Sequence, residues 1–265
     1  MKLFQVDSFT DEPFKGNPAG VCISKTPFDT EFMQNIAMEM NLSETAFVTH
    51  KHGTEFDLKW FTPETEVNLC GHATLATAYI LFEKEGISKD DSITFNTLSG
   101  QLKARFKDEA VELDFPKGIV HPTQPTELLK RAFNISPADY FEGDTYYLIL
   151  FHDQDDILNL KPDLAALKHT NMEIIVTAQS NNPKYDYVNR FFAPCLGIDE
   201  DPVTGSAHCY LAPFWSERLN KNPLIGFQAS KRTGTLTCRV DGDRVFLFGK
   251  AVIMMEMTTY LHDLL

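Results

Sequence analysis

The chain has 265 residues, of which 43% are hydrophobic and 23% charged, and its formal net charge is −13. This composition is that of a well-packed globular protein of one large domain or two small ones, which excludes disorder and a fibrous architecture. An acidic surface repels phosphate backbones and disfavours nucleic acid as a partner. The longest charge-free apolar stretches, 73–82 and 145–151, are shorter than the ~20 residues of a membrane-spanning helix, so we expect no membrane insertion.

The cysteines favour a reducing compartment. Their number is odd, five in all, and no C-x-x-C occurs, so the sequence indicates neither a disulfide framework nor a zinc ribbon. The first seven residues also lack the apolar region of a secretory signal. We therefore expect a cytoplasmic protein with reduced thiols.

Hydrophobic periodicity predicts the elements in chain order. A surface helix is expected at 30–41, with Phe32, Ile36 and Met40 along its apolar stripe. Period-two alternation predicts half-buried antiparallel strands at 54–60, 100–106, 110–115, 185–191 and 245–248. Hairpin turns are expected at 108–109 and 241–242. A last strand is expected at 251–260, returning to the first half of the chain.

Two further segments, 74–82 and 208–219, are apolar on every side, which is typical of a buried helix. Each follows a glycine, Gly71 in the first case and Gly205 in the second. Pro213 is expected to kink or shorten the second of these helices.

The two halves of the chain repeat one another. Four short segments of the first half have counterparts in the same order in the second: 47–49 with 175–177, 56–58 with 185–187, 61–63 with 192–194, and 71–73 with 205–207. A strand pair follows in each half, with the same spacing of 11 residues from its first glycine to a valine. The sequence therefore predicts an α+β fold of two pseudo-symmetric lobes, each a curled, mostly antiparallel sheet around a buried central helix. The lobes are expected at 1–117, completed by 251–265, and at 118–250.

The starts of the two buried helices are candidate anion sites. The first-turn N–H groups of a helix have no partner within the helix and carry a partial positive charge. Glycine at positions 71 and 205 allows a ligand to approach the backbone closely. Because pockets form preferentially between domains, we expect both helix starts to face one cleft that binds a small carboxylate.

Ionisable side chains accompany these helix starts. Glu44 lies between the end of the surface helix and an apolar strand, where desolvation raises the pKa of a carboxyl toward that of a general base. His72 opens the first buried helix, and Asp201 precedes the second. These three groups could together move protons on and off a substrate.

The motifs GNPAG at 16–20, MNLSET at 40–45, CGHAT at 70–74 and EDPVTGSAH at 200–208 occur in the order found in a known family. Together they resemble the phenazine-biosynthesis PhzF-like family of the diaminopimelate-epimerase-like superfamily, over residues 1 to about 255. The resemblance implies two lobes, each a barrel-like sheet around a central helix, with the active site between them. It also implies proton-transfer isomerisation without a cofactor.

The resemblance also implies roles for individual residues. Glu44 is expected to be the general acid/base, with His72 and Asp201 assisting by hydrogen bonding and proton transfer. The residues expected to bind the substrate are Gly71, Ala73, Gly205, Ser206 and, as a pocket-lining residue, Asn17. The family's members need not share a substrate, so the sequence does not specify which acid is used.

Two alternatives stay open at this stage. The wider superfamily includes racemases that use two thiols, and Cys70 occupies the position of the first thiol, but the second helix has no cysteine at the equivalent place. A non-catalytic protein that binds a metabolite or a partner through the same fold is the other alternative. Acid/base isomerisation by Glu44 is the favoured interpretation.

The sequence gives little reason to expect a cofactor or a metal. It contains neither a Rossmann glycine pattern nor a P-loop. His50 and His52 lack a third ligand nearby in the sequence, so we expect no metal site there. The expected partner is a small carboxylate substrate, and exposed sheet edges would favour pairing of two copies as a homodimer.

Overall fold

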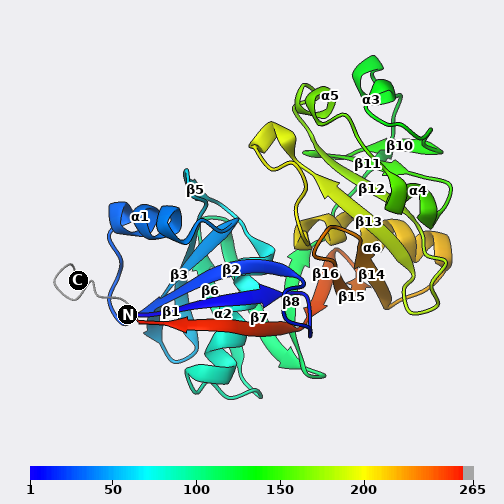
Figure 1. Cartoon of the computed structure of the whole chain (residues 1–265). Coiled ribbons are helices and arrows are strands. Elements are labelled where there is room, and N and C mark those ends of the chain that lie inside the picture. The colour runs from blue at the N-terminus through cyan, green and yellow to red at the C-terminus, as the bar shows by residue number, and fades with distance from the viewer. Residues whose placement is uncertain (259–265) are drawn as a thin grey trace. The chain divides into compact units, whose positions relative to one another are not determined.

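The computed structural model describes residues 1–258, which form two compact units (Figure 1). Unit 1 comprises Met1–Asp114 and the C-terminal stretch that begins at Phe248, and unit 2 comprises Phe115–Leu247. The expected lobe boundaries at 117 and 250 lie close to these divisions. Of the segment 251–265 expected to complete the first lobe, residues 259–265 lie outside the described part of the chain.

Unit 1 is built on a mixed sheet in the spatial order β17-β1-β2-β3-β4-β6-β7-β8. Its strands are β1 (Lys2–Ser8), β2 (Asn17–Ser24), β3 (Glu44–His52), β4 (Glu55–Phe61), β5 (Glu66–Val67), β6 (Ser92–Thr97), β7 (Gly100–Lys107), β8 (Ala110–Pro116) and β17 (Ala251–Met257). The pairs β2–β3 and β4–β6 are parallel, and the other pairs in this order are antiparallel. The C-terminal strand β17 lies beside β1 at the start of the chain (Figure 1), so the predicted return of the chain to its first half is confirmed.

The helices of unit 1 form where the sequence predicts them. Helix α1 (Thr30–Met40) is preceded by Asp29, whose side chain accepts hydrogen bonds from two first-turn N–H groups. It is followed by Asn41, which has the left-handed conformation typical of a helix end. Helix α2 (Gly71–Lys84) is buried on nearly every side and contacts β1, β2, β3, β7 and β17. The α2 helix therefore lies at the centre of the unit, and the expected closure of the sheet into a barrel stays a prediction.

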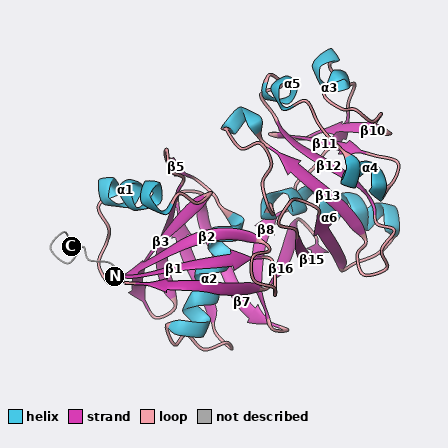
Figure 2. Cartoon of the chain, in the orientation of Figure 1, coloured by secondary structure: helices cyan, strands magenta, loops and turns pink. Residues whose placement is uncertain are grey.

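Unit 2 contains a second mixed sheet flanked by helices (Figure 2). Its strands are β9 (His121–Pro122), β10 (Asp139–Glu142), β11 (Tyr146–Leu150), β12 (Glu173–Gln179), β13 (Tyr187–Phe192), β14 (Leu224–Gln228), β15 (Gly234–Asp241) and β16 (Arg244–Gly249). Its helices are α3 (Glu127–Arg131), α4 (Gln154–Asn159), α5 (Leu164–Lys168), the 3-10 turn η1 (Pro194–Leu196) and α6 (Gly205–Leu219). Successive residues of β12 belong to two different hydrophobic cores. Ile174 lies in the core that includes residues of α3, α4 and α5, and Ile175 lies in the core that includes residues of α6.

The two units share one order of strand pairings. In unit 1 the successive pairs β1–β2, β2–β3, β3–β4, β4–β6 and β6–β7 are antiparallel, parallel, antiparallel, parallel and antiparallel. In unit 2 the pairs β10–β11, β11–β12, β12–β13, β13–β14 and β14–β15 follow the same sequence of directions. The buried helix of each unit follows the fourth strand of its series. In unit 1 the short strand β5 lies between that strand and α2. The strands of these two series, and the buried helix of each unit, are thus structural counterparts.

Pro213 does not shorten α6, which continues to Leu219. Proline lacks the N–H that would bond the carbonyl of Cys209 four residues earlier. That carbonyl instead accepts a hydrogen bond of 3.1 Å from the N–H of Gly118. The interruption of the helical ladder is therefore compensated from outside the helix.

No helix within residues 1–258 is long and apolar enough to cross a membrane.

Candidate active site

In unit 1 the start of β3 meets the start of α2. Glu44 is the first residue of β3 and His72 is the second residue of α2. Glu44 Oε2 lies 3.4 Å from His72 Nε2, and the two side chains are 15% and 7% exposed, respectively. The two expected acid/base residues of this half of the chain are thus in contact, and the carboxylate retains access to solvent.

Burial keeps His72 neutral. It lowers the pKa of the imidazole to about 3. On the far side of the ring, Asn17 Nδ2 lies 3.3 Å from Nδ1 and Cys70 Sγ lies 3.4 Å from the same nitrogen. Since the amide of Asn17 donates to Nδ1, the single proton of the neutral ring is on Nε2 and faces Glu44. The neutral ring thus faces the Glu44 carboxylate with Nε2, and the pair is not a salt bridge at neutral pH.

The turn before β2 fixes Asn17. Gly16 has φ of +68°, and a Cβ on it would lie 2.2 Å from the carbonyl oxygen of Ser8. Only glycine fits this close approach with a positive φ. The hydroxyl of Ser8 in turn donates a hydrogen bond of 2.8 Å to the carbonyl of His72. The β1–β2 connection is thereby attached to the first turn of α2.

Glu44, Cys70 and His72 each offer one potential metal-ligand atom, and these atoms lie within 4.8 Å of one another. They do not converge on one nitrogen of the ring, because Glu44 approaches Nε2 whereas Cys70 approaches Nδ1. A histidine nitrogen binds a metal along its own lone pair. The arrangement therefore does not suit a metal ion shared by all three residues.

The residues that precede α2 and α6 do not cap these helices with their side chains. Neither Cys70 before α2 nor Thr204 before α6 makes a side-chain cap hydrogen bond to the first turn of its helix. Uncapped N–H groups at a helix start attract an anion. The expected substrate-binding residues Gly71 and Ala73 belong to the first of these turns and Gly205 and Ser206 to the second. Ala73 is fully buried and has no polar side-chain atom, so its backbone N–H is its one donor for this role.

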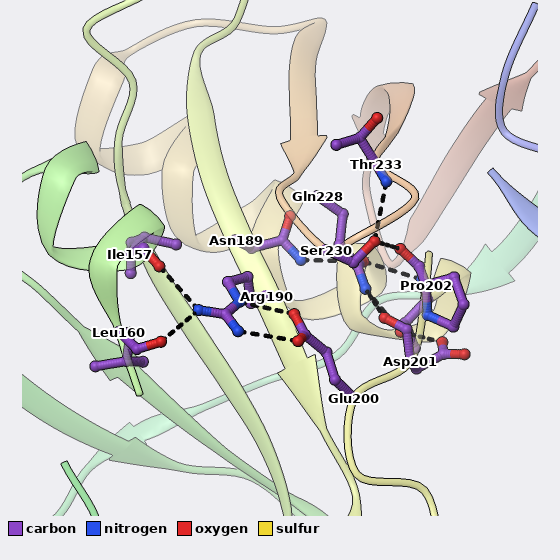
Figure 3. A network of polar contacts seen from close by, with 11 residues as sticks. Ile157, Leu160, Asn189, Arg190, Glu200, Asp201, Pro202, Gln228, Ser230 and Thr233 are labelled. Atoms are coloured by element: carbon purple, nitrogen blue, oxygen red, sulfur yellow. Dashed lines mark hydrogen bonds and ion pairs between the residues drawn. The ribbon is translucent and has the colours of Figure 1, made fainter. Parts of the chain in front are cut away.

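In unit 2, hydrogen bonds orient Asp201. The hydroxyl of Thr204 donates to Asp201 Oδ2. Gln228, fully buried at the end of β14, donates to the carbonyl of Asp201 (2.9 Å) and to the hydroxyl of Thr204 (3.2 Å). The side-chain oxygen of Gln228 accepts from the N–H of Thr204 (2.9 Å) and from Asn189 (3.1 Å), as Figure 3 shows in part. Three of these four hydrogen bonds of Gln228 therefore hold the turn that carries Asp201.

An ion pair fixes the residue before Asp201. Arg190 on β13 donates to both carboxyl oxygens of Glu200, at 2.7 and 2.9 Å (Figure 3). It also donates to the carbonyls of Ile157 and Leu160 at the end of α4. Arg190 therefore links the turn that carries Asp201 to the end of α4, more than thirty residues earlier in the chain.

Ser206 has a partner that sequence reasoning did not identify. Tyr146, the first residue of β11, donates a hydrogen bond of 3.1 Å from its hydroxyl to Ser206 Oγ. Tyr146, Gln228 and Thr204 were all missed, because side-chain contacts between distant segments leave no local pattern in the sequence.

The structure thus groups the expected site residues by unit. Glu44, His72, Asn17, Gly71 and Ala73 cluster at the start of α2. Asp201, Gly205 and Ser206 lie at and just before the start of α6. Thr204 stands before Gly205 where Cys70 stands before Gly71, and Cys209 is buried inside α6 with a thiol pKa raised by burial. No second thiol therefore occupies the position equivalent to Cys70.

Comparison with known proteins identifies the family. The family described as phenazine biosynthesis-like protein, PhzC-PhzF, matches residues 6–257. The chain belongs to this family. Its family membership confirms the resemblance that the four motifs indicated.

Two relatives at high coverage support this assignment. An uncharacterized isomerase of Halalkalibacterium halodurans is 46% identical over 259 residues, which are 96% of each chain. The crystal structure of a PhzF-family phenazine biosynthesis protein from Enterococcus faecalis has a TM-score of 0.93 at 39% identity and covers 98% of this chain and 100% of its own. A probable proline racemase from Agrobacterium radiobacter, at 12% identity and a TM-score of 0.65 over 98% of this chain and 93% of its own, shares the fold. The chain is therefore a PhzF-like member of an α+β fold found in isomerases and epimerases.

Proposed function

We propose that this protein is an isomerase that moves a proton within a small carboxylic acid by general acid/base catalysis, with Glu44 as the proton carrier. The observation that carries this proposal is the contact between Glu44 Oε2 and Nε2 of the neutral His72 at the uncapped start of α2. A partly accessible carboxylate, a neutral imidazole beside it and the N–H groups of a helix start are suited to a proton transfer next to a carboxylate.

The chemistry follows from these groups. The Glu44 carboxylate takes a proton from a carbon of the bound acid, and the C–H electron pair stays on the substrate. The negative charge that develops is stabilised by N–H groups in the first turn of α2. Protonated Glu44 then returns a proton to the substrate at another position. The neutral His72 ring, 3.4 Å from the carboxylate, adds no positive charge that would oppose protonation of Glu44.

Asp201 is proposed to assist from unit 2. Asp201 is 8% exposed. The hydroxyl of Thr204 donates to its carboxyl, and Gln228 holds Thr204 in place. The uncapped start of α6 offers further N–H groups for a substrate carboxylate. The expectation that one substrate lies between the two lobes stays a prediction.

Glu44→Gln tests the proposal. The amide keeps the shape of the side chain but cannot accept the proton, so we expect at least a ~10²-fold loss of substrate C–H exchange with heavy water. The measurement is deuterium incorporation, by mass spectrometry, into a panel of small dicarboxylic acids and α-amino acids. Glu39→Gln, at an exposed position of α1, is the matched control and is expected to match the wild type. Unchanged exchange in Glu44→Gln would remove Glu44 from the mechanism.

The same panel separates the alternatives. A compound that binds to the wild type but neither exchanges nor converts would support the non-catalytic interpretation. A Cys70→Ser variant separates the thiol racemase from the Glu44 mechanism. Because Cys70 Sγ contacts only the far side of the His72 ring in our proposal, we expect Cys70→Ser to retain exchange.

A further inference from the structure

One side of α6 borders a groove in unit 2. The groove has a volume of about 630 Å³, which is within the range of small-molecule pockets. It is lined by residues of α6, of β10 and of the chain at and just before β9, all of which belong to unit 2. Asp201, Gly205 and Ser206 are not among the lining residues, so the groove is distinct from the expected site at the start of α6.

Aromatic and apolar side chains form much of the lining. Phe141 and Phe214 are nearly buried, and their ring centroids lie 5.0 Å apart in an edge-to-face arrangement. Val120 and Pro213 extend this apolar surface, and Ile119 lines the groove with 61% of its surface exposed. An aromatic ring bound here would remove exposed apolar surface from water and pack against other rings.

Tyr210 adds a hydroxyl to the groove. A Cβ on Gly118 would lie 2.5 Å from the ring of Tyr210, so a larger residue at position 118 would displace the ring. Nowhere in residues 1–258 does the hydroxyl of Tyr210 form a hydrogen bond. Burial, and then the negative charge of Asp144, raise its pKa, so the hydroxyl is protonated at neutral pH. It is therefore available to donate a hydrogen bond to a ligand.

The guanidinium of Arg218 is held in place by aromatic rings. Its Cζ lies 3.5 Å from the ring centroid of Phe214 and 5.2 Å from that of Phe141. Its Nη1 donates a hydrogen bond of 3.3 Å to the carbonyl of Phe214. Within the described part of the chain, Arg218 forms no ion pair. A positioned guanidinium whose other N–H groups are unused binds a carboxylate through two parallel hydrogen bonds.

Two further charged side chains, Lys117 and Glu217, line the same groove. The ammonium of Lys117 donates to the carbonyl of Gly242 at 3.0 Å. Neither Lys117 nor Glu217 forms an ion pair with any residue of 1–258. Glu217 and Asp139 are the carboxylates whose charge acts on Arg218. In a chain with a net charge of −13, the groove thus holds two cations without an ion-pair partner and one such carboxylate.

These charges favour a ligand that carries both signs. A plain carboxylate would be attracted by Arg218 and Lys117 but repelled by Glu217. In an α-amino acid the ammonium and the carboxylate are attached to one carbon, and Glu217 and Arg218 are consecutive residues of α6. We propose that this groove binds an aromatic α-amino acid, with its carboxylate on Arg218, its ammonium on Glu217 and its ring against Phe141 and Phe214. This inference does not depend on the proposed function.

Calorimetric titration of the full-length protein with L-phenylalanine tests the proposal. 3-Phenylpropionate lacks the ammonium and phenethylamine lacks the carboxylate, so each loses charge-assisted hydrogen bonds and is expected to bind at least ~10-fold more weakly. Arg218→Met should weaken binding of L-phenylalanine by at least the same factor. The matched control is Arg239→Met, expected to bind as the wild type does. Arg239 also lies over a ring, 4.2 Å from the centroid of Phe246, but it is paired with Asp241 and does not line the groove.

Glu217→Gln tests the recognition of the ammonium. This variant should bind L-phenylalanine and 3-phenylpropionate with similar affinity, because the amide neither attracts the ammonium strongly nor repels a carboxylate. Since α-amino acids are also candidate substrates, the place of binding needs its own readout. The methyl resonances of Ile119 are expected to shift when L-phenylalanine is added to the wild type and not when it is added to Arg218→Met. Arg218→Met is expected to keep the deuterium exchange of the wild type.

The outcomes separate this proposal from the proposed function. Absence of saturable binding of L-phenylalanine up to ~10 mM would overturn the groove as an amino-acid site, as would equal binding of 3-phenylpropionate by the wild type. Binding that Arg218→Met leaves unchanged, or that does not shift the resonances of Ile119, would place the ligand elsewhere and also overturn it. None of these results affects the role of Glu44, which is tested by exchange in Glu44→Gln.

Discussion

His72 illustrates how burial determines the role of a residue. The motif CGHAT and the family resemblance suggested a residue that transfers protons, but a histidine with a pKa of about 3 carries no charge at neutral pH. The contacts of Asn17 and Cys70 with Nδ1 leave the other nitrogen to donate toward Glu44. His72 thus lies beside Glu44 as a neutral ring, a property that depends on tertiary packing and that the sequence could not supply.

A second buried histidine makes stability depend on pH. His208 is fully buried in α6, its Nδ1 lies 2.7 Å from the hydroxyl of Tyr187, and burial lowers its pKa to about 3. An unfolded histidine binds a proton below pH ~6.5, whereas folded His208 stays neutral until about pH 3. Its contribution to stability is therefore full above the unfolded pKa and is lost as the pH falls between these two values.

His208→Gln isolates this contribution. The amide can still accept the hydrogen bond from Tyr187 but does not titrate, so the variant should lose less stability in acid than the wild type. Between pH 6 and pH 4, the free energy of unfolding of the wild type is expected to fall faster than that of His208→Gln, by up to ~1.4 kcal/mol per pH unit. Urea unfolding at several pH values measures it, and His169→Gln, beside α5, serves as the control. Parallel pH profiles for the wild type and His208→Gln would contradict the assignment.

At the scale of elements, the turn before α6 is held from two strands. Gln228 of β14 bonds Asp201 and Thr204, and Arg190 of β13 bonds Glu200. Both strands thereby fix the backbone on which Asp201 and the first N–H groups of α6 depend. The conformation of this turn therefore depends on contacts with the sheet as well as on the motif EDPVTGSAH.

Arg190→Met tests the contribution of the ion pair. The substitution keeps an apolar stem but leaves Glu200 and the carbonyls of Ile157 and Leu160 without their donor. Removing one partner of a partly buried pair costs the desolvation of those left behind, so we expect a loss of about 2 kcal/mol in the free energy of unfolding. Arg190→Lys should lose part of it, because a lysine cannot form the fork of contacts. Equal urea midpoints for the three proteins would show that the network adds no stability.

The elements themselves were largely predictable from the sequence. The helix at 30–41 and the strand pair at 100–115 were found from periodicity because their apolar faces are regular. The turn at 108–109 has positive φ at both residues, as a tight hairpin requires. The registers of pairings distant in the chain were not predictable, since they depend on contacts that no local pattern encodes.

The residue of unit 2 that corresponds to Glu44 was not identified from the sequence for a related reason. The repeat in the sequence aligned 47–49 with 175–177, which places Glu44 opposite Met172. The strand register shifts this alignment by one residue and places Glu44 opposite Glu173. One residue matters because it moves a side chain to the other face of a strand. An alignment of the two halves on their strand-end phenylalanines, Phe61 and Phe192, would have required a gap that the sequence alone does not locate.

At the scale of the whole molecule, the two units differ in how the chain builds them. Unit 2 is a single continuous segment, Phe115–Leu247, with two hydrophobic cores made from its own residues. Unit 1 is discontinuous, because β17 must return from the end of the chain to pair with β1. Without β17, the β1 strand would expose an unpaired edge and part of the unit's apolar surface.

We therefore expect the two units to respond differently to isolation. A fragment of residues 115–247 should fold on its own and unfold cooperatively, because it retains both hydrophobic cores and the pairings of β10 to β15. A fragment of residues 1–114 should not, whereas the same fragment joined through a flexible linker to residues 248–258 should regain folded structure, since β17 is restored to β1. Circular dichroism and urea unfolding of the three fragments decide the matter. A cooperative transition in residues 1–114 alone would show that β17 is dispensable, and its absence in residues 115–247 would show that unit 2 depends on the rest of the chain.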